Sequence, residues 1–546
     1  MFKNKSLIAI FLLALFLRTY KLGTHPIGFH ADEARAGWNA YSILKTGLDD
    51  RGNQFALYYN TFGDYRPTGI IYLTIPSLII FGLNEFAVRF PSALIGALTI
   101  FPLFLFTKEI TKKNKVAITA SLLLALSPWH ISTSRGTSEV IISIFFALFG
   151  LYYFQKAISD KKPNIRTFTI SFLLLSFSYF FYHSIRLLAP LFVLTLITTQ
   201  IKNIISHHSL KHSAILAFSL IALTGLMATQ SEARGRFSQV SIFSDLDVKY
   251  ELSRMPFEEG PNKIFQARLF HNKPLTYSRK FINEYTKYFS ANFLISDIAK
   301  PSRYATVGIG LMTYIELALF IFGLISIAQK KSSFLPLALL LVSPFPAALT
   351  TEDSPNLHRA LFMIIYIVII EAYGLIFISQ ISQKYREKLV TLCFTLLILN
   401  FTFYLHMYYV HAPYQIANGR SYGTKELALK LNELESSYDQ IILTNIPDDI
   451  YPWLAFFGRK DPAIFNKDAI QREHGNWSYK NFHFTSQRCP SRDAFESPEV
   501  KKLLVVDARG CAEESNLLIR DDVKILSQIK EPNESIIYTL WSRIED

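Results

Sequence analysis

Two adjacent carboxylates, Asp32 and Glu33, lie just past the first strongly apolar segment of the chain. A carboxylate at a boundary between membrane and water can accept a proton from a hydroxyl group, or it can bind a divalent cation. An ordinary solvated acidic pair would have the same spacing. What this pair can do therefore depends on the residues that the rest of the chain places beside it.

Cationic residues occur at several other boundaries between polar and apolar sequence. Arg66 precedes a proline at the end of a long polar stretch, and Arg186, His358 and Arg359 lie in short polar loops. Such side chains can bind phosphate through charge-assisted hydrogen bonds. The alternative for Arg66 is an arginine whose side chain extends to the lipid headgroups without binding a substrate.

Glu139 adds a further carboxylate at a membrane edge, directly after the polar sequence SRGTS at 134–138. A base for an acceptor hydroxyl, together with cations for a leaving phosphate, suits displacement of a phosphate from a sugar. Glu316 and Glu371 lie in the middle of predicted spans, where charges are costly. A protonated acid bonded between helices and a proton-coupled transporter both fit those two positions.

Membrane-spanning helices are the elements that must position these residues. The chain has 546 residues, of which 50% are hydrophobic and only 18% are charged. Apolar blocks of about 18 or more residues are typical of transmembrane helices. The N-terminus resembles a signal peptide, but no small-residue cleavage site follows it, so we expect it to remain as a first span. We expect about eleven spans, at about residues 6–20, 87–107, 116–133, 139–157, 167–183, 187–201, 213–229, 305–328, 334–349, 360–381 and 389–410.

The distribution of lysine and arginine predicts the orientation in the plasma membrane. The short loops 2–5, 108–115, 161–166, 202–212, 330–331 and 384–388 are all basic, and basic short loops stay in the cytoplasm. This assignment requires that 69–83 lies along the membrane surface as a juxtamembrane helix. The N-terminus is then inside. The same loops account for the formal net charge of +13, so we expect no nucleic-acid partner.

The predicted domain division is a membrane domain, residues 1–410, and an extracytoplasmic α/β domain, residues 411–546. The membrane domain contains two long outer loops, 21–86 and 230–304. Leucine spacing predicts a helix over 424–434, and strand-like runs occur at 440–444, 502–506 and 536–541. Outside the cytoplasm, Cys489 and Cys511 could form a disulfide.

The stretch from His30 to about Lys108 resembles polyprenyl-phosphate-dependent GT-C glycosyltransferases. It is most similar to the bacterial family-39 enzymes, which include protein O-mannosyltransferases and lipid A aminoarabinose transferases. The matching pieces are DEA at 32–34, WNAYSILKTG at 38–47, GDYRP at 63–67 and FGLNEFAVRFPSAL at 81–94. Beyond them the resemblance is mostly architectural. It implies a polytopic helical GT-C membrane fold.

The resemblance also implies roles for individual residues. Asp32 corresponds to the family's catalytic acid in the first outer loop and is expected to be the general base, with Glu33 as its neighbour. Glu139 falls where relatives often carry an aspartate, and it is expected to support Asp32 or to share a divalent cation, Mg or Mn, with it. No other cofactor is expected. The expected phosphate ligands are Arg66, His358 and Arg359, to which Arg186 is added because it lies in an outer turn.

The function we expect from the sequence is inverting transfer of a sugar from a polyprenyl-phosphate donor at the outer face of the membrane. The sugar is a mannose-like hexose or an aminopentose, and the acceptor is a hydroxyl of a protein, lipid or glycan. A transporter or flippase of lipid-linked sugars is the first alternative, and it would predict internal repeats and interrupted spans; no convincing repeat is visible. A sensor or scaffold is the second, and it gives no reason for Asp32 and Glu33 to accompany the basic turn at Arg66.

Overall fold

The computed structural model describes residues 5–61, 64–296, 300–306, 308–444, 450–467, 477–485, 500–508 and 522–544. The chain forms two compact units. The first contains Met1–Tyr20, Leu57–Ile70 and Ser92–Val410, and the second contains Lys21–Ala56, Ile71–Pro91 and His411–Asp546. Contacts thus group most of the first outer loop with the C-terminal chain rather than with the membrane helices. The predicted division at residue 410 stays a prediction.

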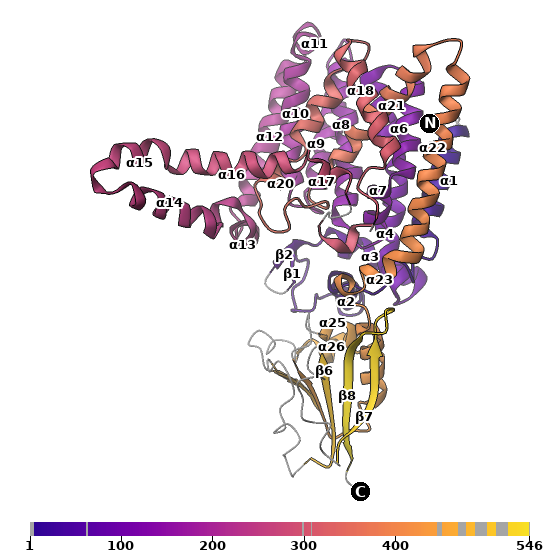
Figure 1. Cartoon of the computed structure of the whole chain (residues 1–546), viewed down its shortest axis with the longest axis vertical. Coiled ribbons are helices and arrows are strands. Elements are labelled where there is room, and N and C mark those ends of the chain that lie inside the picture. Colours follow the sequence, from indigo (N-terminus) through magenta and orange to yellow (C-terminus); the bar gives the residue numbers. More distant parts are fainter. Residues whose placement is uncertain are drawn as a thin grey trace. The chain divides into compact units, whose positions relative to one another are not determined.

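The first unit is a bundle of apolar helices (Figure 1). Three elements, α3 (Gly69–Phe81), α4 (Glu85–Leu98) and η4 (Met407–His411), carry residues of both units. A two-stranded hairpin, β1 (Tyr58–Thr61) and β2 (Asp64–Pro67), also belongs to the first unit. Its other helices are α1 (Lys5–Thr19), α5 (Ile100–Thr111), α6 (Asn114–Leu126), α7 (Pro128–Ser134), α8 (Glu139–Ser159), α9 (Ile165–Ser178), α10 (Ile185–Thr199), α11 (Ile201–Ser206), α12 (Leu210–Ala228), α18 (Tyr314–Ala328), α19 (Leu335–Val342), α20 (Phe345–Ala348), α21 (Met363–Ile381) and α22 (Arg386–His406).

Several of these helices have the length and composition to cross a membrane. Within the described part of the chain, five candidates are Glu85–Thr111, Glu139–Ser159, Leu210–Ala228, Met363–Ile381 and Arg386–Gln415, and the pair α6 and α7, bent by 56°, makes a sixth if it is one span. Shorter apolar helices include α3, α9, α10 and α18. The predicted polytopic helical membrane protein is therefore confirmed, whereas the number of eleven spans, the surface position of 69–83 and the orientation remain predictions.

Close contact between α18 and α21 depends on two glycines. A Cβ atom on Gly374 would lie 1.9 Å from the Leu319 carbonyl oxygen, and one on Gly323 would lie 2.0 Å from the Ile370 carbonyl oxygen. Small residues allow helix backbones to approach in this way, which increases van der Waals contact inside a membrane.

The interpretation of Glu316 as a mid-span acid was wrong. Its helix, α18, begins only at Tyr314, and Glu316 is in the first turn, where its carboxylate accepts a hydrogen bond from the Thr313 amide at 2.7 Å. Thr313 and Glu316 form a capping box, which satisfies amides that a helix start leaves unpaired. Glu371, in contrast, is buried within α21.

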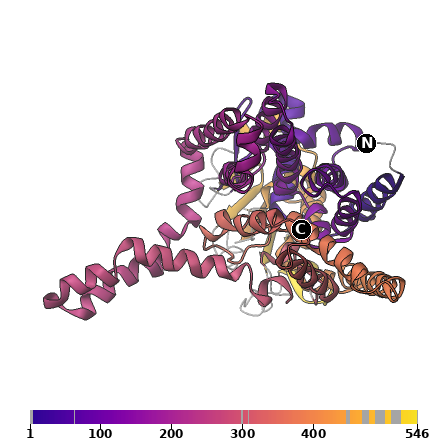
Figure 2. The same cartoon turned by 90° about the horizontal axis from the view of Figure 1, so that it is seen from above.

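The stretch after α12 forms a series of polar helices, α13 (Ser231–Val240), η1 (Ile242–Ser244), α14 (Leu246–Glu259), η2 (Pro261–Lys263), α15 (Ile264–Phe270), α16 (Lys273–Lys287), α17 (Ala291–Leu294) and η3 (Ser302–Tyr304). Figure 1 shows α14, α15 and α16 leaving the bundle sideways, and Figure 2 shows the same three helices extending outward when the unit is seen from above.

The second unit contains a six-stranded mixed sheet with the order β4-β5-β3-β6-β8-β7. The predicted helix and strands are confirmed as α24 (Thr424–Leu434), β3 (Gln440–Thr444), β6 (Lys502–Ala508) and β8 (Ile536–Ile544). Strand β3 is parallel to β5 and β6, whereas β8 runs antiparallel to β6. The remaining elements of the C-terminal part are η4 (Met407–His411), α23 (Ala412–Gln415), η5 (Asn418–Arg420), α25 (Tyr451–Phe457), α26 (Pro462–Phe465), β4 (Trp477–Tyr479), β5 (Phe482–Thr485) and β7 (Lys524–Lys530).

Helix α2 (Ala31–Thr46) of the second unit carries the two carboxylates at 32 and 33. The helix begins with a capping box, in which His30 Nδ1 accepts from the Asp32 amide and Glu33 accepts from the His30 amide. It ends at Gly47, whose φ of 78° is a left-handed conformation that glycine adopts without strain. Cys489 and Cys511 lie outside the described residues, so the predicted disulfide stays untested.

Candidate active site

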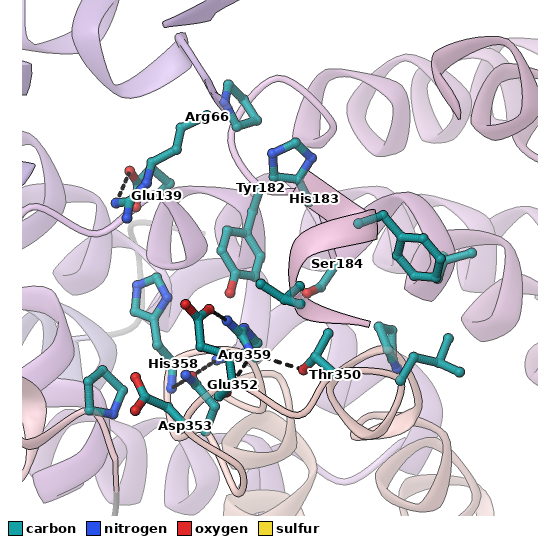
Figure 3. A pocket seen from close by; sticks show the side chains of 18 of the residues that line it. Arg66, Glu139, Tyr182, His183, Ser184, Thr350, Glu352, Asp353, His358 and Arg359 are labelled. Carbon is teal, nitrogen blue, oxygen red and sulfur yellow. Dashed lines mark hydrogen bonds and ion pairs between the residues drawn. The ribbon is translucent and has the colours of Figure 1, made fainter. Parts of the chain in front are cut away.

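A cavity of about 280 Å³ in the first unit brings together residues that are far apart in the sequence. Figure 3 shows Arg66 and Glu139 turned toward each other on one side of it, with Arg359 and Glu352 on another. Its charged and imidazole-bearing lining residues are Arg66, Glu139, His183, Arg303, Glu352, Asp353, His358 and Arg359. The structure therefore brings together four of the residues selected from the sequence: Arg66, Glu139, His358 and Arg359.

Arg66 lies on β2, paired across the hairpin with Tyr59. Both side chains approach Glu139, which begins α8. The Tyr59 hydroxyl donates to Glu139 Oε1 at 3.4 Å, and Arg66 Nη1 lies 3.9 Å from the same oxygen. The start of a helix stabilises a carboxylate through its unpaired amides. Glu139 is consequently a buried acid at the start of a helix, with Tyr59 and Arg66 beside its carboxylate.

The junction between β2 and α3 lies directly against the turn after α9. The Gly69 amide donates to the Phe180 carbonyl at 3.1 Å, and a Cβ atom on Gly69 would lie 2.6 Å from that oxygen. A glycine is therefore required for this approach. The contact positions Arg66, three residues earlier, beside the turn that supplies Tyr182 and His183 to the cavity.

Arg186 does not line the cavity; it lies behind it and acts on a residue that does. Its Nη1 donates to His183 Nδ1 at 3.1 Å, and its Nη2 donates to the Tyr179 carbonyl at 3.2 Å. Because Nδ1 is an acceptor here, His183 carries its proton on Nε2, which donates to the Tyr65 carbonyl at 3.0 Å. Arg186 thus fixes His183, and His183 in turn fixes the strand of Arg66. This geometry supports a positioning role instead of the phosphate contact expected from the sequence.

His358 is held on three sides. Its Nε2 lies 3.0 Å from the Ser138 hydroxyl, its ring stacks on Tyr304 with centroids 5.0 Å apart, and Tyr182 meets it edge-on at 5.3 Å. The neighbouring Arg359 forms an ion pair with Glu352 and donates to the Thr350 hydroxyl at 2.9 Å. An anion bound by Arg359 would therefore compete with the more exposed Glu352 carboxylate.

Three charged lining residues, Arg303, Glu352 and Asp353, are not among the site residues predicted from the sequence. The Arg303 guanidinium lies over the Tyr304 ring at 5.2 Å, and Asp353 has a φ of 52° in the loop that also carries Glu352. One signal could have indicated Arg303, because it is a basic residue directly before a predicted span on the side where basic residues are expected to be rare. Nothing in the sequence around Asp353 separates it from a solvated loop acid.

Asp32 and Glu33 belong to the second unit. Asp32 is mostly buried in the first turn of α2, with His30 Nδ1 3.5 Å from its Oδ2. The helix start favours the charged form of a carboxylate at this position. The structure thus gives Asp32 a fixed backbone position at the start of a helix.

Glu33 is an integral part of the packing of the second unit. Its two carboxylate oxygens accept hydrogen bonds from Arg89 at 3.2 and 3.0 Å, and Oε2 also accepts one from Arg420 at 2.7 Å. Burial alone would raise the pKa of Glu33, but the charges of Arg420 and then Arg89 lower it to about 2. Because its oxygens are occupied, Glu33 is suited to orienting its neighbour rather than to accepting a proton.

The same two arginines hold the loop that precedes α2. Arg89 donates to the carbonyls of Leu22 and Gly28 at 3.0 and 2.5 Å, and Arg420 donates to that of Ile27 at 3.0 Å. Gly28 has a φ of 68°, and a Cβ atom there would lie 2.4 Å from the Arg420 carbonyl oxygen. This close approach explains the glycine. It also shows that residues from the C-terminal part of the unit determine how the segment before Asp32 folds.

Comparison with known proteins shows the fold. ArnT from Cupriavidus metallidurans, solved bound to undecaprenyl phosphate, superposes with a TM-score of 0.54 at 10% identity, over 98% of this chain and 97% of ArnT. This chain has a GT-C fold. An archaeal oligosaccharyltransferase, AglB from Archaeoglobus fulgidus in complex with an inhibitory peptide and a dolichol-phosphate, gives a TM-score of 0.47 at 14% identity. That match covers 83% of this GT-C chain but 63% of AglB.

The matches found by sequence comparison cover a smaller part of the chain than the structural matches do. Residues 66–227 of the GT-C chain match the family described as dolichyl-phosphate-mannose-protein mannosyltransferase. An uncharacterized protein of Aquifex aeolicus is 34% identical over 83 residues, which are 15% of this chain and 17% of that protein. The matched family segment contains Arg66, Glu139 and Arg186, whereas Asp32, His358 and Arg359 lie outside it.

No group of three or more His, Cys, Asp or Glu side chains that could hold a metal ion occurs among the described residues of this GT-C chain. Asp32 and Glu139, the pair expected to share a divalent cation, belong to different units. The binding of a divalent cation by Asp32 and Glu139 therefore remains a prediction.

Proposed function

We propose that this chain is an inverting membrane glycosyltransferase that takes its sugar from a polyprenyl-phosphate donor and transfers it to a hydroxyl acceptor. One observation carries this proposal. The cavity of the GT-C unit is lined by three arginines and two histidines together with the buried carboxylate of Glu139 and the two loop acids Glu352 and Asp353. Such a set of cations suits the phosphate that leaves when the bond to the sugar breaks.

Arg66 is the most direct ligand for that phosphate. Its Nη1 lies 3.9 Å from Glu139 Oε1, which is farther than in a charge-assisted hydrogen bond, and its side chain lines the cavity where the phosphate would bind. Arg303 and Arg359 line the same cavity. Arg359 would exchange the exposed Glu352 for the phosphate as the bond to the sugar breaks, because the departing polyprenyl phosphate then gains a second negative charge.

The reaction we propose is a single displacement. The acceptor hydroxyl oxygen forms a bond to the anomeric carbon, the bond from that carbon to the phosphate oxygen breaks, and polyprenyl phosphate leaves with both electrons of the broken bond. Asp32 accepts the hydroxyl proton. Because attack and departure occur on opposite faces of the sugar, the configuration at the anomeric carbon inverts.

The comparisons support the donor class and leave the sugar open. The family matched by residues 66–227 is described as using dolichyl-phosphate mannose, and the ArnT structure holds undecaprenyl phosphate. We propose a mannose-like hexose or an aminopentose as the sugar, and a protein, lipid or glycan hydroxyl outside the cytoplasm as the acceptor. A divalent cation, Mg or Mn, held by Asp32 and Glu139 would assist departure of the phosphate.

The test is turnover by the purified protein in liposomes that contain polyprenyl-phosphate hexose or polyprenyl-phosphate aminopentose. We expect one donor to lose its sugar to an added acceptor fraction, with free polyprenyl phosphate as the other product. Mass spectrometry of envelope glycans with and without the gene identifies the acceptor. Donor that moves between the leaflets but keeps its sugar would contradict a transferase and indicate a flippase.

A further inference from the structure

Three helices of the first unit, α14, α15 and α16, form an extended hairpin that we name the lateral arm, residues 246–287. Both views show it pointing away from the helical bundle (Figures 1 and 2). We call the segment 229–245 the root of the arm; it contains α13 and η1 and connects α12, a candidate membrane span that ends at Ala228, to α14. Figure 1 shows the arm leaving the bundle beside α13 and running across the direction of the long helices.

Helix α14 has an exposed apolar stripe. Leu246, Tyr250 and Phe257 are spaced by four and seven residues, which places them on one side of the helix. Their side chains are 77%, 60% and 85% exposed. An apolar row of this extent on a projecting helix is typical of a surface that contacts another phase or another molecule.

The far end of the arm combines apolar exposure with positive charge. Phe265 is 79% exposed, and Ile264, Leu269 and Phe270 are each more than half exposed. The segment 260–273 contains Lys263, Arg268 and Lys273 and no aspartate or glutamate. Basic residues beside exposed phenylalanine and leucine are the composition of helices that lie in the surface of an anionic bilayer.

A groove in the arm has the same mixed chemistry. Its volume is about 770 Å³, and its lining includes Leu252, Pro256 and Phe257 together with Arg268 and Lys273. Apolar walls and cations in one groove suit a lipid, which has acyl chains and a phosphate. An identical tip from a second copy would instead bring like charges together.

We propose that the lateral arm lies in the surface of the bilayer, in the leaflet on the side of the cavity. Its exposed apolar side chains insert among the acyl chains, and the cations of its tip contact anionic lipid headgroups. This inference does not depend on which reaction the cavity supports.

The arm is joined at its root to the rim of the cavity. The Ile242 amide donates to the Leu349 carbonyl and the Thr351 amide donates to the Val240 carbonyl, both at 2.9 Å. Val240, Leu349 and Thr350 all line the cavity. An arm fixed in the bilayer surface would therefore fix this rim at a defined depth relative to the lipids.

The experiment is depth measurement on the full chain in nanodiscs of neutral lipid with one third anionic lipid. An environment-sensitive fluorophore is attached to Leu269→Cys, and lipid-borne doxyl groups and aqueous iodide serve as quenchers. Phe218→Cys on the candidate span α12 is the lipid reference, and Glu433→Cys on α24 is the aqueous reference. Unmodified protein carried through the same labelling gives the signal of the native cysteines, which is subtracted.

We expect the label on the arm to be quenched by doxyl lipid nearly as strongly as the label at 218 and to be protected from iodide. Phe257→Ser combined with Phe265→Ser should abolish most of that quenching, because both side chains are largely exposed and their loss leaves the arm folded. Ile464→Ser, an exposed apolar change on α26, should leave it unchanged. Iodide quenching equal to that of the label at 433 would overturn the proposal. A label that is protected from iodide but is not quenched by doxyl lipid would also overturn the proposal. If that protection rises with the density of protein in the nanodiscs, it would indicate that a second copy of the chain covers the arm.

Discussion

Arg66 differs from a structural arginine in how loosely it is held by its acidic neighbour. Its contact with Glu139 is 3.9 Å long and its side chain is partly exposed, whereas Arg89 and Arg420 are buried against Glu33. A guanidinium that lines the cavity and is this far from Glu139 is placed to contact an anion bound there. We therefore expect the donor phosphate, rather than Glu139, to be its main partner during the reaction.

Replacing Arg66 by alanine should weaken donor binding by about 10- to 100-fold, the usual effect of losing a hydrogen bond to a charged group. Arg66→Lys should cost less, because a lysine keeps the charge and loses only the two-pronged geometry. The measurement is equilibrium binding of the lipid donor to purified protein. Wild-type affinity in Arg66→Ala would show that another residue binds the phosphate.

The ion pairs of Glu33 lead to a prediction about how the stability of the folded protein changes as the pH falls. Its folded pKa of about 2 is below the usual 4.5, so the folded state binds this proton more weakly than the unfolded state does. The stabilisation from Arg420 and Arg89 is therefore complete above about pH 4.5 and is lost as the pH falls toward 2. Its size is about 3 kcal/mol, since one pKa unit corresponds to about 1.4 kcal/mol.

Thermal unfolding of wild type and Glu33→Gln, followed by tryptophan fluorescence between pH 7 and pH 2.5, tests this prediction. The difference in stability between the two proteins should be largest at neutral pH and should shrink below pH 4.5. A difference that stays constant over the whole range would mean that the ionised carboxylate contributes nothing to folding.

The sequence identifies single candidate residues more readily than the residues that they contact in the folded chain. Adjacent carboxylates and a loop arginine are visible in one short window, so Asp32, Glu33 and Arg66 were selected. The partner of Glu33, Arg420, is 387 positions away, and no local pattern relates two such residues. Arg186 was assigned to phosphate for the same reason: its position in a turn was visible, but its bond to His183 depends on the fold.

At the scale of elements, the junction between β2 and α3 decides where Arg66 lies. Gly69→Ala would place a Cβ atom 2.6 Å from the Phe180 carbonyl and equally close to the Phe181 ring, so the strand or the turn must move. We expect a loss of donor affinity comparable to that of Arg66→Ala. The measurement is donor binding by both variants.

Gly225→Ala is the matched control for this change, because no atom lies within 4 Å of a Cβ at that position of α12. It should bind donor like wild type and be slightly more stable, since alanine favours helix more than glycine does. Normal binding by Gly69→Ala would show that the contact with Phe180 does not position the arginine.

The sequence predicts long and regular elements better than short or irregular ones. Long apolar helices and the strands β3, β6 and β8 have strong periodic patterns, so the sequence predicted them. Strands β4 and β5 have three and four residues, which is too short for alternation to be distinctive. The sequence predicts the lateral arm only as part of a long polar stretch, because its helices are short and carry many charged residues.

At the scale of the whole molecule, the charge distribution predicts which ends of the helices face the cytoplasm. Reporters fused after Lys113 and Arg386 should be cytoplasmic, and reporters fused after Asp50, Lys280 and Asp461 should be external. The assay is paired alkaline phosphatase and green fluorescent protein fusions at each position. A cytoplasmic reporter at Asp461 would place the C-terminal domain inside and remove the basis for an external reaction.

The central claim is that Asp32 accepts the proton of the acceptor hydroxyl during sugar transfer from the lipid donor. The most direct measurement is transfer of labelled sugar by Asp32→Asn in liposomes, with donor binding measured in parallel. Positioned general-base catalysis contributes about 100- to 10,000-fold. We therefore predict a loss of that size with unchanged expression and donor affinity, and a smaller loss for Glu33→Gln. Near-normal transfer by Asp32→Asn would contradict the claim.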